Sequence, residues 1–310
     1  MHSLEEELRQ LQSRGALDAA TAARALAPEF SVFEELRAAL YAAVALVITG
    51  VGLLIKEHLD RIGPLTLIFA LALAGAACYV PAIRAKSRGM APATVAEYVL
   101  LLGALIVSAD VGYAESQFHL LGANWSRHLL ILAAFHALTA YVFGSRLVLS
   151  VALTSLAGWF GIERGPGNVA PWEFATPELG LRALACAAVI LAWRAIDRSS
   201  QGPRFRPVLE HFAANLAFWG VLGWCANARL RVVGVLALLV LAGFAIHKAL
   251  RSRAESFAVY GVGYGAVGVS LVIAEITDLS VLGAVLVLAI ALTAAAILRR
   301  LHDLLKEGRA

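Results

Sequence analysis

The sequence predicts an all-α, polytopic membrane protein, and three observations support this fold class. Hydrophobic residues make up 60% of the 310 residues, charged residues make up only 15%, and the mean hydropathy is +0.76. A soluble domain carries about 25% charged residues, so this chain lacks the polar surface that a globule in water needs. Long apolar runs recur from about residue 36 onward, and such runs are typical of transmembrane helices.

Residues 1–30 are expected to form a small cytoplasmic domain ahead of the membrane domain. Leu4, Leu8 and Leu11 repeat at helical spacing, and a second short helical pattern follows before Pro28. We therefore predict an amphipathic hairpin of two helices over 3–27. Its apolar stripe would pack against the membrane domain, a second copy of the chain or a cytoplasmic partner.

Residues 31–310 are expected to form a transmembrane domain of about ten helical spans. A helix needs about 20 apolar residues to cross ~30 Å of hydrocarbon, and most of the runs approach that length. The fourth, fifth and sixth runs are short, and the sequence leaves open whether all three span. The ten runs lie near 36–55, 62–83, 93–112, 128–144, 147–162, 179–196, 208–226, 230–250, 255–274 and 279–298.

The distribution of basic residues predicts that both termini lie in the cytoplasm. With ten spans and an inner N-terminus, nineteen of the 26 Lys and Arg residues fall on the inner side, six fall on the outer side, and Arg182 lies just inside a span. Cytoplasmic loops of membrane proteins carry an excess of Lys and Arg. The opposite orientation would reverse this bias. Because basic loops in a membrane protein mainly reflect its orientation, the net charge of +4 gives no indication of nucleic-acid binding.

The densest polar group in the apolar part of the sequence lies at the outer end of the third run and in the loop that follows. It comprises Asp110, Glu115, Gln117, His119 and Asn124. Charged groups at the edge of hydrocarbon usually face a cavity or a partner. We predict an extracytoplasmic polar cavity lined by these residues, with His136 from the fourth run and Arg182 from the start of the sixth. Solvated helix ends are the alternative explanation.

One glycine-rich motif could suggest a nucleotide site, but its context argues for helix packing. Gly263-Tyr-Gly265-Ala-Val-Gly268 fits GxGxxG and lies inside an apolar run, whereas a dinucleotide site needs a preceding strand. With Gly261 it predicts a face of small residues that lets helices approach closely. The same packing role is predicted for Gly50 with Gly52 and for Gly220 with Gly223.

The histidines do not form a recognisable metal motif. His119, His128 and His136 follow one another at spacings of nine and eight residues, which match no familiar zinc pattern, and the chain has no HExxH or GxSxG motif. No metal, cofactor or catalytic residue is predicted, so an enzyme is the least favoured class. An ionisable group inside a span is a functional candidate, although a histidine hydrogen-bonded between helices is the commoner case for His136.

Three groups of residues together carry a resemblance to a known family. They are Leu8-x-x-Leu11-x-x-x-Gly15-x-Leu17-Asp18, Gly50-Val-Gly52-Leu-Leu-Ile with Asp60-x-Ile62, and Gln117-x-His119-Leu-x-Gly122-x-Asn124-Trp125. In combination they resemble prokaryotic predicted membrane proteins of domain-of-unknown-function family 2157 over about residues 4–160. Lys56-Glu57-His58-Leu59 replaces the Asn-Trp pair expected after the first span. The resemblance implies a multipass protein of the bacterial inner membrane and no particular activity.

Two functional classes fit these observations. The first is a transporter, or a protein that binds a small molecule or lipid, because ten spans can form two inverted halves of five as in many secondary transporters. The second is a non-catalytic scaffold or sensor that acts through its N-terminal hairpin. The expected partners are the lipid bilayer, a small-molecule or lipid ligand, and a second copy or cytoplasmic protein bound through residues 3–27. No nucleic-acid partner is expected.

Overall fold

The computed structural model describes residues 13–14, 33–58, 63–89, 94–121, 126–161, 176–277 and 280–307. Within these ranges the chain forms helices and no strand, which confirms the predicted all-α class. The hairpin predicted over 3–27 lies outside the described residues except for Ser13 and Arg14, so it stays a prediction. The predicted domain boundary at residue 30 also lies outside the described residues and stays a prediction.

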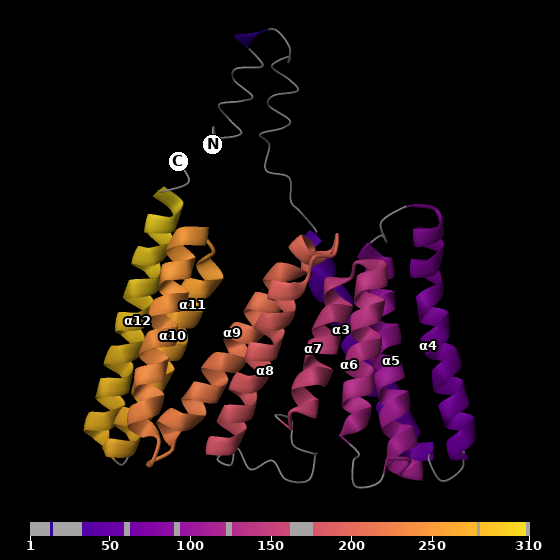
Figure 1. Ribbon diagram of the computed structural model, residues 1–310, viewed down its shortest axis with the longest axis horizontal. Coiled ribbons are helices and arrows are strands. Elements are labelled where there is room, and N and C mark those ends of the chain that lie inside the picture. Colours follow the sequence, from indigo (N-terminus) through magenta and orange to yellow (C-terminus); the bar gives the residue numbers. More distant parts are fainter. Residues whose placement is uncertain are drawn as a thin grey trace. The chain divides into compact units, whose positions relative to one another are not determined.

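The described part of the chain contains ten helices (Figure 1). Their bounds are α3 (Phe33–His58), α4 (Pro64–Ser87), α5 (Thr94–Phe118), α6 (Arg127–Phe143), α7 (Arg146–Trp159), α8 (Pro177–Ile196), α9 (Gly202–Ala226), α10 (Arg231–Ser252), α11 (Glu255–Ile276) and α12 (Val281–Glu307).

Six of these helices are long and apolar enough to cross a membrane, namely α4, α5, α8, α10, α11 and α12. Helix α8 begins at Pro177 and has 20 residues, so the sixth apolar run is longer than the sequence pattern indicated. Helices α6 and α7 have 17 and 14 residues, and α9 carries charged residues in its first half. The structure therefore supports several spans, while the full count of ten stays a prediction.

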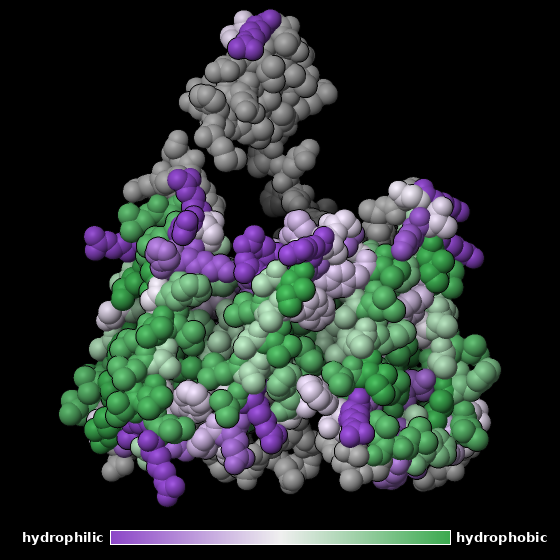
Figure 2. All heavy atoms as spheres, in the orientation of Figure 1, coloured by the Kyte–Doolittle hydropathy of each residue, from purple (hydrophilic) through white to green (hydrophobic). Residues whose placement is uncertain are grey.

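Hydrophobic side chains cover the outer flanks of these helices. Figure 2 shows hydrophobic residues along the middle of the helices and hydrophilic residues gathered toward their ends. On α12, Val281 is 84% exposed and Leu292 is 65% exposed. Water rarely meets apolar surface of this extent on a soluble protein, so lipid is the solvent that fits these helices.

The chain divides into two compact units, which we describe separately. The first comprises residues 37–235, and in it α4 packs against α5, α6 against α7, and α8 against α9. The second comprises residues 1–36 and 236–310, and in it α11 packs against α12. The core of the first unit is fully buried and aliphatic, with one aromatic ring from α9. Its largest members are Leu100, Leu149, Leu153, Ile190 and Phe205.

Two glycines allow α8 and α9 to approach closely. A β-carbon on Gly180 would lie 2.7 Å from the carbonyl oxygen of Gly220, and a β-carbon on Gly220 would lie 2.7 Å from the carbonyl oxygen of Gly180. In the second unit, a β-carbon on Gly261 would lie 2.9 Å from the carbonyl oxygen of Ala242 on α10. The predicted small-residue packing is therefore confirmed at Gly220 and Gly261.

The same prediction is wrong at three other glycines. A β-carbon on Gly50, Gly52 or Gly265 would meet no atom of the described residues within 4 Å. Gly265 is four residues from Gly261, but it faces an open apolar groove between α11 and α12. Residues four apart lie on the same side of a helix, so the spacing predicted the same packing role for Gly261 and Gly265. The positions of the neighbouring helices decide which of the two glycines is in contact with another backbone.

Contacts within the first unit bring five helix ends together. Lys86 Nζ lies 5.9 Å from the centre of the Phe143 ring, so α4 and α6 end on the same side. Arg146 Nε donates to the carbonyl oxygen of Arg204 at 3.0 Å, which joins the starts of α7 and α9. Because α8 ends beside the start of α9, all five ends lie on one side of the unit, which we call the basic end.

The basic end carries most of the described cationic side chains of the first unit. Those at the basic end are Arg84, Lys86, Arg88, Arg146, Arg194, Arg198, Arg204 and Arg206. Those at the opposite helix ends are Arg127, Arg182, Arg229 and Arg231. The excess of basic side chains on one side is therefore also found when only the described side chains of the first unit are counted.

Candidate functional site

Polar side chains follow one face of α5. Glu97, Ser108 and Glu115 are separated by eleven and seven residues, which correspond to about three and two helical turns. Ser108 Oγ lies 2.8 Å from His136 Nε2 on α6, and Glu97 Oε1 accepts a hydrogen bond from Ser145 Oγ at 3.3 Å. This face of α5 therefore points toward α6 and the start of α7.

Helix α6 also carries buried polar side chains, of which His136 contacts α5. His128, His136 and Thr139 are all buried, and His136 has no exposed surface. We call the combined set the polar row; it consists of Glu97, Ser108, Glu115, His128, His136, Thr139 and Ser145. At about 1.5 Å per residue, Glu97 and Glu115 lie about 27 Å apart along α5. The polar row thus covers most of the ~30 Å thickness of a hydrocarbon core.

His136 occupies the middle of the polar row. Ser108 Oγ lies 3.0 Å from the carbonyl oxygen of Ala104 and 2.8 Å from His136 Nε2, and the imidazole tautomer sets which of Ser108 and His136 donates. His136 Nδ1 is buried and has no hydrogen-bond partner among the described residues. Buried polar atoms in folded proteins are nearly always partnered, which makes this nitrogen a candidate contact for water, a proton or a ligand.

Glu115 closes the polar row at the end opposite the basic end. Its side chain is buried, and both carboxylate oxygens accept from the backbone N–H of Leu121 at 3.2 Å. The chain turns between these residues through His119, whose φ of 48° lies in the left-handed region. A carboxyl group held in this way fixes the start of the turn after α5.

The structure separates the residues that the sequence predicted as one cavity. Asp110 is half-buried, with an Oδ1 atom that has no partner among the described residues. Asp110 is two residues from Ser108, or about 200° around the helix, so it points away from the polar row. Gln117 and His119 are exposed.

The remaining predicted residues have different surroundings. Arg182 is exposed on α8, and its guanidinium lies so close to Gly161 that a β-carbon there would be 2.8 Å from Nη1. Asn124 lies outside the described residues. Of the seven predicted residues, only Glu115 and His136 belong to the polar row.

A second polar network lies at the basic end. Tyr141 Oη donates to Asp197 Oδ2 at 2.6 Å and accepts from Trp193 Nε1 at 3.1 Å, while the backbone N–H of Ser199 donates to Asp197 Oδ1 at 2.9 Å. Partial burial raises the pKa of the Asp197 carboxyl, but the bonds from Tyr141 and Ser199 outweigh this and leave the pKa below its ordinary value. Asp197 is therefore ionised at neutral pH.

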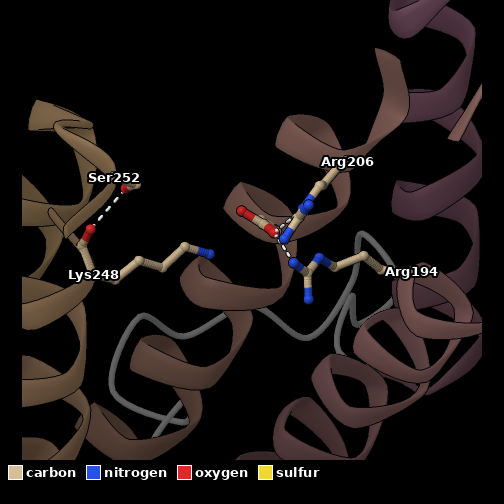
Figure 3. A network of polar contacts seen from close by, with 5 residues as sticks. Arg194, Arg206, Lys248 and Ser252 are labelled. Atoms are coloured by element: carbon tan, nitrogen blue, oxygen red, sulfur yellow. Dashed lines mark hydrogen bonds and ion pairs between the residues drawn. The ribbon is translucent and has the colours of Figure 1, made fainter. Parts of the chain in front are cut away.

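Beside this network, two arginines share one carboxylate. Arg194 Nη2 and Arg206 Nε both contact Glu210 Oε1, at 2.5 Å and 3.0 Å (Figure 3). The Glu210 side chain is 10% exposed, whereas that of Arg206 is 62% exposed. We call Arg194, Arg206, Glu210 and Asp197 the arginine corner.

No metal site emerges from the described side chains. Among the described residues, no group of three or more His, Cys, Asp or Glu side chains is placed to hold a metal ion. Cys78, Cys186 and Cys225 are free thiols. The chemistry that the site offers is proton and hydrogen-bond exchange by carboxylate, imidazole and hydroxyl groups.

Comparison with known proteins finds one family match, which covers the N-terminal part of the chain. Residues 9–149 match the family model described as Predicted membrane protein (DUF2157). The match confirms the resemblance predicted from the sequence, with slightly narrower bounds. The DUF2157 segment contains the whole polar row, and the arginine corner lies beyond it. No curated protein and no solved structure matches the chain.

Sequence reasoning missed most of the polar row. Glu97, Ser108 and Thr139 each lie in an apolar run and look like isolated polar residues in the sequence. A signal was available, because Ser108 and Glu115 are two helical turns apart and both lie near the predicted third span. The pairing of Ser108 with His136, 28 residues later, depends on how α5 and α6 pack.

Proposed function

We propose that this multispanning membrane protein is a transporter and that the polar row forms its proton pathway. One observation carries the proposal: His136 is fully buried between membrane helices, with a ring nitrogen that has no partner among the described residues. An unsatisfied buried polar group costs about 1–3 kcal/mol. Chains of carboxylate and histidine side chains mark proton relays in pumps and transporters, which supports a functional reason for this cost.

The order of groups along the polar row suits stepwise proton transfer. Glu115 and His128 lie at one end, Ser108 and His136 in the middle, and Glu97 with Ser145 at the basic end. Each group can both accept and release a proton or relay one through a hydroxyl. In this proposal, a small-molecule substrate enters on the outer side, where the exposed side chains of Gln117, His119 and Arg182 lie.

The proposal includes the orientation derived from the sequence. In the first unit, eight described basic side chains belong to the basic end and four to the opposite helix ends, and the positive-inside rule assigns the richer side to the cytoplasm. We therefore place the basic end in the cytoplasm, with ten spans, both termini inside, and the protein in a bacterial inner membrane.

Proton flux into proteoliposomes tests the proposal. The protein is reconstituted into vesicles that contain a trapped pH-sensitive dye, and a potassium diffusion potential drives protons inward. The wild type should acidify the lumen faster than protein-free vesicles. His136→Gln keeps a polar side chain but removes the imidazole, and it should reduce the rate about tenfold or more, since a positioned proton-transfer group contributes 10²–10⁴-fold.

The matched control is His247→Gln, which alters an exposed histidine of α10 in the second unit. This variant should acidify the vesicles at the wild-type rate. Deletion of residues 1–28 should also leave the acidification rate unchanged. If the protein is instead a scaffold that acts through its hairpin, this deletion should abolish its function. Equal rates for wild type and protein-free vesicles, or for wild type and His136→Gln, would refute the proton pathway.

A further inference from the structure

A cavity lies at the arginine corner, at the junction of α8 and α9. Its volume is about 490 Å³. It is lined by Arg194, Ala195, Asp197, Gly202, Pro203 and Arg206. It is thus formed by the last turn of one helix, the first turns of the next and the short connection between them.

Basic side chains outnumber carboxylates around this cavity, with Arg194, Arg198, Arg204 and Arg206 against Glu210 and Asp197. Arg194 and Arg206 share the single carboxylate of Glu210, so one guanidinium charge remains uncompensated within that group. Arg198 and Arg204 are exposed nearby and make no ion pair among the described residues. Asp197, which also lines the cavity, accepts from Tyr141 and Ser199 and keeps its negative charge, so the net positive charge of the region comes from Arg198 and Arg204.

Hydrogen-bond donors at this cavity remain available. Arg194 Nε is buried and has no hydrogen-bond partner among the described residues. Helix α9 begins at the cavity with Gly202 and Pro203, has no acidic residue in its first turn, and receives no side-chain hydrogen bond from its N-cap residue Gln201. The backbone at the start of α9 adds few donors, because Gly202 N–H donates to the carbonyl oxygen of Ser199, Pro203 has no N–H, and Phe205 N–H donates to the carbonyl oxygen of Gln201. The guanidinium groups are therefore the donors that this cavity offers.

The position of the cavity along α8 indicates its depth in the membrane. Helix α8 is apolar and long enough to span, and Arg194 lies in its last turn. The last turn of a spanning helix reaches the headgroup region, where the lipid phosphates lie. Ile196, at the end of α8, is 75% exposed, which places an apolar side chain beside the basic cavity.

We propose that this cavity binds the phosphate group of an anionic phospholipid in the cytoplasmic leaflet. The arginines supply charge-assisted donors to the phosphate oxygens, and Ile196 contacts the adjoining acyl region. Basic pockets between membrane helices suit headgroups of this kind. The exposed isoleucine favours a lipid over a free phosphate ion. The site is separate from the polar row and does not depend on the proton pathway.

Thermal unfolding of the detergent-solubilised protein, titrated with defined lipids, tests the proposal. Phosphatidylglycerol should raise the Tm in a saturable way, because a ligand that binds only the folded state stabilises it. Phosphatidylcholine should have little effect. Arg206→Gln should weaken the apparent affinity for phosphatidylglycerol about tenfold, the effect of losing one hydrogen bond to a charged group. Arg229→Gln, a matched change at the opposite end of the same unit, should leave the affinity unchanged.

Glu210→Gln gives a second test in the opposite direction. This variant releases both arginines from their shared carboxylate, so phosphatidylglycerol should bind more tightly even if the lipid-free protein melts at a lower temperature. Inorganic phosphate at the same concentration should produce no comparable shift; an equal shift would identify a free phosphate site and overturn the lipid assignment. Equal responses to both phospholipids, or an unchanged affinity in both Arg206→Gln and Glu210→Gln, would also overturn it.

Discussion

Replacing Gly220 by alanine should destabilise the first unit by forcing α8 and α9 apart. The new β-carbon would lie 2.7 Å from the carbonyl oxygen of Gly180 and 3.2 Å from the β-carbon of Ala183. An ordinary carbon–oxygen contact is about 3.3–3.6 Å, so the helices must separate by roughly 0.6–0.9 Å at this point. The contact is with backbone, which cannot rotate away as a flexible side chain can.

The size of the effect follows from two opposing terms. Overpacking a close contact costs about 1–3 kcal/mol, whereas alanine in place of glycine within a helix stabilises by about 0.5–1 kcal/mol. The net loss should therefore be about 1–2 kcal/mol. Separation of the helices would also disturb Trp224, whose Nε1 donates to the carbonyl oxygen of Pro177 on α8 at 3.1 Å.

Tryptophan fluorescence during thermal unfolding in detergent measures this effect, because Trp219 and Trp224 both lie on α9. The matched control is Gly112→Ala on α5 in the same unit, where the new β-carbon would meet no atom within 4 Å. Gly220→Ala should lower the Tm by several degrees, and Gly112→Ala should leave it unchanged or raise it slightly. A Tm for Gly220→Ala at or above the wild-type value would refute the reasoning about close packing.

Two further predictions concern orientation and pH. A thiol introduced at exposed Gln117 should react with a membrane-impermeant maleimide in intact cells, whereas one at exposed Ser200 should react only after lysis; the reverse pattern would invert the topology. Because the folded-state pKa of Asp197 lies below its ordinary value of 3.8, its ionised form contributes stability above that value and loses it as the pH falls through the lowered pKa. The wild type should therefore melt above Asp197→Asn at neutral pH, and the gap should close in acid; a gap independent of pH would contradict this assignment.

The sequence by itself determined the solvent of this protein and the class of its fold. The low content of charged residues and the long apolar runs predict helices that lie in lipid. In a bilayer every backbone polar group must be hydrogen-bonded within the protein, and a helix achieves this within one segment. The family resemblance likewise rested on short local motifs, such as the one around Gln117 and His119, and the match over 9–149 confirmed it. These are local properties of the chain, so they can be read without knowing which helices touch.

Only the tertiary structure decided which polar residues meet. Sequence proximity grouped Asp110 with Glu115 and His119, but the helical rotation turns Asp110 away from Ser108 while packing joins Ser108 to His136. Glu210 lies near the start of an apolar run, and only the fold places Arg194 and Arg206 on its carboxylate oxygen. Gly220 and Gly265 gave similar packing signals, yet only Gly220 meets a neighbouring backbone. In each case the missing information is the identity of the facing helix, which the spacing along one chain segment does not contain.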